Sequence, residues 1–193
     1  MSNETDGEEE FESPDFSDEA AKPNFQAVLS EVEKLCNSSR DSLSDIQGGY
    51  SFAVKNIDAE KLLAEHHQRL LQKGAYLFLY ERDSNGKGAL ALLPTTDWAD
   101  VIRAFQTNGA NYDLMPEDII KWMQKLSARQ SFVITGISWD WLEGRFLDPV
   151  KESRKLARQM YKFCPDIVDQ GVESVKALAQ SLEKDGCFFF WWD

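Results

Sequence analysis

The residues best suited to chemistry lie in a short segment that alternates tryptophans with acids. In a strand, this alternation would place Trp139 and Trp141 on one face and Asp140 on the other. Asp140, Glu143 and Asp193 could then form an acidic pocket for general acid–base catalysis or for a divalent cation. The structural alternative is a salt-bridged strand pair, in which a neighbouring arginine neutralises one of these acids.

A second candidate segment has the pattern of a helix end followed by a turn. Pro165 cannot continue a helix, Asp166 favours a turn, and Asp169 is positioned to cap the next helix. The functional alternative is a polar rim of Asp166, Asp169 and Gln170 near the C-terminal strand. Cys164 would need a lowered thiol pKa and a nearby base to act as a nucleophile. Its neighbours are apolar, so we assign no catalytic residue.

Composition excludes several classes of function. The chain has 193 residues, with 21 Lys and Arg against 33 Asp and Glu, and a net charge of −12. Phosphate contacts need clustered Lys and Arg, so we expect no nucleic-acid partner. No run of about 18 apolar residues predicts a membrane span. The N-terminus lacks the basic and apolar regions of a secretory signal, which favours a cytoplasmic location.

The cysteines and histidines give no metal or redox motif. Cys36, Cys164 and Cys187 are an odd number at wide spacing, a pattern typical of a reducing compartment. His66 and His67 are adjacent, and on a helix they would point about 100° apart, so they cannot share a metal ion. We therefore expect neither a metal nor a cofactor.

Apolar periodicity predicts that an α/β (α+β) domain positions these residues, with helices packed against a mixed sheet. The predicted strands are 50–54, 75–80, 89–93, 132–137, 139–146 and 187–192. The predicted helices are 25–35, 58–70, 97–105, 116–126, 149–163 and 172–182. Because the last strand is almost wholly aromatic, it is expected inside the sheet with both faces covered.

The charge distribution divides the chain into a tail and one domain. Residues 1–22 are predicted to be a disordered acidic tail, and residues 23–193 a single compact domain. Nine acids and no Lys or Arg occur in the first 20 residues, which leaves a net charge of only −3 for the rest. Such a tail either maintains solubility or steers a basic partner.

Several blocks of sequence are distinctive in order and spacing. They are Thr107-Asn-Gly-Ala-Asn-Tyr, Thr135-Gly with Trp139-Asp-Trp-Leu-Glu-Gly-Arg-Phe, Phe163-Cys-Pro-Asp-Ile-Val-Asp-Gln-Gly, and Phe190-Trp-Trp-Asp. In these blocks the chain resembles a bacterial domain-of-unknown-function family, DUF4253. The resemblance runs from about residue 50 and is densest over 107–193. It implies an α/β domain and brings with it no activity, cofactor or site residue.

Charge and the lack of an assembled catalytic set favour a non-enzymatic protein-binding function, such as an immunity protein that neutralises a basic bacterial toxin. The candidate partner-binding residues are Trp139, Asp140, Trp141, Glu143, Asp166 and Asp169. The alternative is a small enzyme or ligand-binding domain with a carboxylate and tryptophan pocket. Its carboxylates would be Asp140, Asp166, Asp169 and Asp193. Convergence of these carboxylates in one pocket would favour the alternative.

Overall fold

The described residues form one mixed sheet of seven strands, in the order β1-β2-β4-β3-β5-β6-β7. The computed structural model describes residues 13–54, 59–82 and 88–192. The strands are β1 (Arg40–Ser42), β2 (Tyr50–Ala53), β3 (Tyr76–Arg82), β4 (Gly88–Leu93), β5 (Phe132–Ile137), β6 (Trp141–Phe146) and β7 (Cys187–Trp191). β3 and β5 are parallel, and the other neighbours are antiparallel. The predicted α/β class is confirmed.

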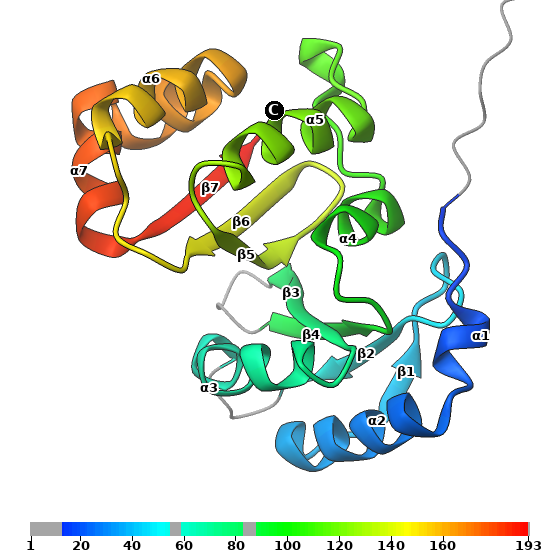
Figure 1. The fold of residues 1–193 in the computed structure, drawn as a ribbon. Helices are drawn as coiled ribbons and strands as arrows, with labels where there is room; N and C mark the ends of the chain where they lie inside the picture. The colour runs from blue at the N-terminus through cyan, green and yellow to red at the C-terminus, as the bar shows by residue number, and fades with distance from the viewer. Residues whose placement is uncertain (1–12, 55–58, 83–87, 193) are drawn as a thin grey trace, which may run out of the picture.

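Helices cover the two faces of the sheet unequally (Figure 1). The α-helices are α1 (Ser17–Ala20), α2 (Pro23–Cys36), α3 (Ala59–Leu71), α4 (Trp98–Phe105), α5 (Pro116–Ser127), α6 (Ser153–Phe163) and α7 (Val175–Asp185). Two short elements, η1 (Ala110–Tyr112) and η2 (Ile167–Val172), are a 3-10 turn and a π-helix. One core contains apolar residues of α4 to α7, and the other contains those of α2 and α3 packed on β2, β3 and β4. Among the described residues of β5, β6 and β7, only Trp141 packs against the second core, so most of that face is uncovered.

The last strand lies at the edge of the sheet, which corrects the prediction that it is inside with both faces covered. Phe188 and Phe190 are buried on the covered face, whereas Phe189 points the other way and is 44% exposed. A run of aromatic residues resembles a strand buried on both sides, because no polar residue marks the open face. Here the aromatic side chains of that face remain partly accessible.

A hydroxyl group reinforces the junction between the two halves of the sheet. Leu79 of β3 is opposite Gly136 of β5 in the parallel pair. The backbone N–H of Ile134 donates to the buried Tyr76 hydroxyl at 2.9 Å. This bond satisfies a buried polar side chain and fixes β5 beside β3.

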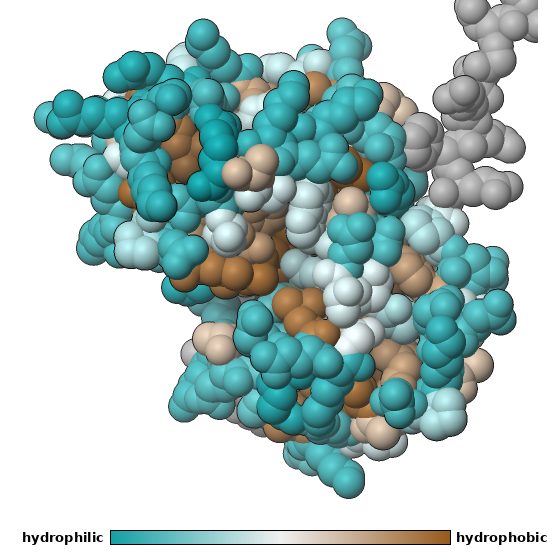
Figure 2. Space-filling view, viewed as in Figure 1, coloured by the Kyte–Doolittle hydropathy of each residue, from teal (hydrophilic) through white to brown (hydrophobic). Residues whose placement is uncertain are grey.

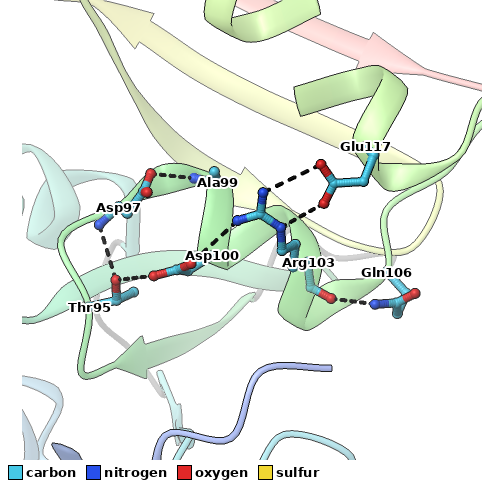
Figure 3. Close-up of polar contacts among 7 residues, drawn as sticks. All are labelled: Thr95, Asp97, Ala99, Asp100, Arg103, Gln106 and Glu117. Atoms are coloured by element: carbon cyan, nitrogen blue, oxygen red, sulfur yellow. Dashed lines mark hydrogen bonds and ion pairs between the residues drawn. The ribbon is translucent and has the colours of Figure 1, made fainter. Parts of the chain in front are cut away.

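A polar network fixes α4 against α5 (Figure 3). The Asp97 side chain accepts from the Ala99 N–H in the first turn of α4 and so caps the helix. Thr95 donates to Asp100 at 2.7 Å, and Arg103 Nε donates to Glu117 of α5 at 2.7 Å. The loop between α4 and α5, which packs on the end of β7, therefore starts from a fixed position.

The folded part of the chain begins earlier than the predicted boundary at residue 23. Phe16 is buried, and its N–H donates to Gln47 O at 3.0 Å. Gly48 allows this approach, because a Cβ there would lie 2.5 Å from the Phe16 backbone. Phe16 packs in one core and Ala20 of α1 in the other. The part of the predicted tail before residue 13 lies outside the described residues.

Candidate functional site

The uncovered face of β5, β6 and β7 forms one wall of a groove. We call this surface the open face: Val133, Thr135, Trp141, Glu143, Arg145, Cys187, Phe189 and Trp191. Leu63, His67 and Gln68 of α3 form the opposite wall, and the groove has a volume of about 520 Å³. Figure 2 shows apolar surface gathered where the two halves of the molecule meet, on an otherwise mostly hydrophilic face.

The groove continues around the free edge of β7. Beyond that edge, its lining includes Asp166 and Val172 in or next to η2, and Leu178, Ser181 and Asp185 of α7. Among the described strands, β7 pairs only with β6. The groove thus exposes both a sheet face and a strand edge.

Acids outnumber bases in the lining of the groove. Within the described part of the chain, its carboxylates are Glu60, Glu143, Asp166 and Asp185, and its guanidinium is Arg145. Gly136 leaves room for the Glu143 side chain across the sheet, because a Cβ at Gly136 would lie 2.6 Å from Glu143 Oε1. By formal charge, the described lining of the groove is therefore net acidic.

His67 contributes a neutral, buried ring to the α3 wall. Its Nδ1 lies 2.7 Å from Leu77 O, and its ring meets Tyr76 edge-on at 5.0 Å. Burial lowers the pKa of His67, so the imidazole stays neutral at physiological pH. The adjacent His66 is only partly buried.

Asp166 is a buried carboxylate, 5% exposed, held by two donors. The Tyr112 hydroxyl donates to Asp166 Oδ1 at 2.7 Å, and the Gln170 amide donates to the same oxygen at 3.1 Å. The hydrogen bond to Asp166 raises the pKa of Tyr112 to about 12, because the carboxylate opposes ionisation of the phenol. Asp169, in contrast, is exposed and accepts from Tyr161 at 3.1 Å.

The surroundings of the Cys164 thiol suit a structural role rather than a nucleophilic one. Its thiol is buried and donates to Trp191 O at 2.9 Å. Burial raises the pKa of this thiol to about 12, so the nucleophilic thiolate is scarce at neutral pH. This side chain ties the chain before η2 to the end of β7.

The segment around Trp139 differs from the predicted continuous strand. β6 begins at Trp141, so Trp139 lies in the preceding turn, where it is 64% exposed, and the two tryptophans do not share a strand face. Asp140 O accepts from Trp192 N–H at 3.0 Å. Trp141 lies on the open face and stacks on Phe189, with ring centroids 6.2 Å apart.

The structure brings together only part of the predicted site. Glu143 and Asp166 line the groove, and Trp141 packs beside it. Trp139, Asp140 and Asp169 are not among its lining residues, and Asp193 lies outside the described residues. The α3 wall and Phe189 were not predicted. The last strand is aromatic at every position from 188 to 192, so no alternation singles out Phe189, and nothing in the local sequence indicates the approach of α3.

The described ranges contain neither a metal-binding cluster nor a membrane-spanning helix. Residues 13–54, 59–82 and 88–192 contain no group of three His, Cys, Asp or Glu side chains arranged to hold a metal ion. None of the helices in these ranges is long and apolar enough to cross a membrane.

The distinctive blocks of the sequence meet around the end of β7. Asn108 N–H donates to Trp139 O at 2.9 Å. Gly109 lies against the Trp192 indole, and a Cβ there would be 2.8 Å from the ring. Two hydrogen bonds add to these contacts, one from the Tyr112 hydroxyl to Asp166 and one from the Cys164 thiol to Trp191 O. Together they hold the end of the C-terminal strand in place.

The fold and groove define an α/β domain whose sheet is open on one side at its C-terminal half. A family model described as "Domain of unknown function (DUF4253)" matches residues 89–193, and the chain belongs to this family. The match starts at residue 89 rather than at about 50, so α3, one wall of the groove, lies outside it. No curated protein and no solved structure matches the chain.

Replacing Tyr112 with phenylalanine tests the structural role of these contacts. The variant removes a donor from buried Asp166, and a hydrogen bond to a charged group contributes about 1.5–3 kcal/mol. We expect the free energy of unfolding, measured by urea denaturation, to fall by about this amount. The matched variant Tyr161→Phe removes a donor from exposed Asp169, where water can replace it, and should cost clearly less. Equal losses would contradict the structural role of Tyr112.

Proposed function

We propose that this protein binds a basic protein partner through the groove beside β7. The observation that carries the proposal is the combination, in one groove, of a partly exposed aromatic side chain with a surplus of carboxylates. Partly exposed aromatic side chains are effective anchors because they bury a large area at low entropic cost. Phe189, which stacks on Trp141, is such an anchor.

Charge supports a cationic partner in particular. The whole chain has a net charge of −12. Its electrostatic field therefore attracts basic proteins over several ångströms and accelerates their association. A groove with local acids then gives the docked complex its orientation. The specific form that we propose is neutralisation, in which the protein covers a cationic surface of a cytoplasmic partner such as a bacterial toxin.

The test is capture of a partner by wild-type protein, followed by binding kinetics with two matched variants. Phe189→Ala removes the proposed anchor, and we expect affinity to fall by about 30-fold or more, mainly through a faster off-rate. Met115→Ala removes another exposed apolar side chain, which does not line the groove, and should leave affinity unchanged. Added salt should slow association of all three proteins. An acidic partner, or equal affinity of Phe189→Ala and wild type, would refute the proposal.

Binding and conversion of a small molecule is the second candidate function. A groove of about 520 Å³ lies within the usual size range of ligand sites, and Glu143 and Asp166 line it. This candidate replaces the first if wild-type protein chemically changes a small molecule and Glu143→Gln abolishes that change while the fold is retained.

A further inference from the structure

The outer edge of β7 has backbone groups directed away from the sheet. Phe146 N–H donates to Gly186 O at 2.8 Å, and Trp192 N–H donates to Asp140 O at 3.0 Å. Hydrogen-bonded pairs alternate along an antiparallel ladder, so the residues between these pairs direct their N–H and C=O groups outward. In β7 these residues are Cys187, Phe189 and Trp191.

This outer edge is only partly occupied in the described structure. The Cys164 thiol donates to Trp191 O at 2.9 Å and so closes the edge beside η2. The backbone N–H and C=O of Cys187 and Phe189 have no hydrogen-bond partner among the described residues. Unpaired edge groups of this kind are a template for an additional strand.

The edge and the open face belong to the same three residues of β7. Their side chains lie on the open face, and their outward backbone groups lie along the groove. A strand added here would therefore extend the open face and place its own side chains beside Phe189. Val172 and Leu178 lie beyond the edge, where they can contact alternate side chains of the added strand.

We infer that the edge of β7 binds an extended segment of the partner by strand addition, a mode that rests on the proposed function. The segment alternates apolar residues with lysine or arginine. The apolar residues pack on the open face around Phe189, and the basic residues, which alternate to the other face of the added strand, meet Asp185 at the end of α7.

Charge argues against two occupants from this protein itself. Residues 1–12 contain only acidic charged side chains, which the acids of the groove repel. A second copy that paired β7 with β7 would bring two sets of the same acids together. A basic segment from a different chain has no such penalty.

Hydrogen exchange on the full-length protein tests the mode of binding without requiring a variant. The probe is a synthetic peptide, Lys-Val-Lys-Phe-Lys-Val-Lys, at saturating concentration. We expect exchange of the Cys187 and Phe189 amides to slow by at least about tenfold, as these N–H groups enter new backbone hydrogen bonds. The control peptide Lys-Val-Lys-Pro-Lys-Val-Lys disrupts the added strand, and Glu-Val-Glu-Phe-Glu-Val-Glu has the wrong charge; neither should protect these amides.

A pair of substitutions at one position separates the backbone from the side chain. Phe189→Ala removes the ring but keeps the outward N–H, whereas Phe189→Pro removes both. Proline is tolerated in edge strands where the N–H faces outward, and circular dichroism checks the fold. We expect Phe189→Pro to bind the basic peptide at least about fivefold more weakly than Phe189→Ala, because a donor to the added strand is lost.

Strand addition is overturned if the basic peptide leaves the Cys187 and Phe189 amides unprotected, or if both control peptides protect them equally. It is also overturned if these amides are already protected from exchange in a dimer detected by ultracentrifugation, because a second copy then occupies the edge. Protection that is lost only when residues 1–12 are deleted would overturn it as well, because those residues then occupy the edge. In each of these cases the affinity of the captured partner can still depend on Phe189, and its association rate on salt. The proposed function is therefore tested independently of strand addition.

Discussion

Replacing Phe190 with alanine is expected to lower the free energy of unfolding by about 3–5 kcal/mol. Phe190 is fully buried, and its ring contacts those of Trp122, Phe163 and Trp192 at centroid distances of 5.1, 5.5 and 5.7 Å. Removing it leaves a cavity between α5, α6 and β7 that rigid aromatic neighbours cannot fill. Urea denaturation followed by circular dichroism measures the loss.

The adjacent residue provides the matched control. Phe189 occupies the same strand but points to the open face, where 44% of it is exposed and its ring stacks only on Trp141 among the described rings. Phe189→Ala should therefore cost about 1 kcal/mol or less. Similar losses at both positions would show that β7 is covered on both faces, as its composition had suggested.

The contrast between Phe189 and Phe190 also shows which features of the fold follow from sequence. Periodicity predicts the helices and strands because each pattern depends on neighbours within one or two turns. The order of strands depends on pairing between distant segments. The sequence therefore predicts that β7 is a strand, but not that it lies at the edge of the sheet.

The candidate site was partly predictable for the same reason. Glu143 and Asp166 are notable because acids lie beside aromatic residues in their own segments. The α3 wall reaches the groove only through tertiary packing. On α3 itself, both His66 and His67 have apolar residues at helical spacing, and a rotation of about 100° decides which one is buried. The structure buries His67.

An unusual element explains the incorrect cap prediction. Asp169 was expected to cap the following helix, but the chain continues through the π-helix η2, and Ser174 caps α7 by accepting from Ala177 N–H. A π-helix is rare and has no strong sequence pattern. It places Asp166 and Gln170 together, and Tyr112 reaches Asp166 from the loop after α4.

Gly144 lies in the middle of β6, opposite Phe188 of β7 and Ile134 of β5. A Cβ at this position would lie 2.3 Å from Phe188 Cζ and 2.6 Å from the backbone oxygen of Val133. The Phe188 ring could move, but the oxygen belongs to the adjacent strand and can move only if β5 separates from β6. The residue is glycine because two strands and a phenylalanine ring occupy the space of a side chain.

Gly144→Ala is therefore expected to lower the free energy of unfolding by about 3 kcal/mol, at the upper end of the usual cost of overpacking. The control is Gly171→Ala, whose Cβ would lie 3.7 Å from Asp166 O, an ordinary contact, and we expect a change within about 0.5 kcal/mol. Thermal and urea unfolding of the two variants measure the difference. Because Gly144 also lines the groove, displacement of Phe188 should weaken partner binding as well. A Gly144→Ala protein as stable as wild type would mean that β5, β6 and β7 are not packed as closely as described.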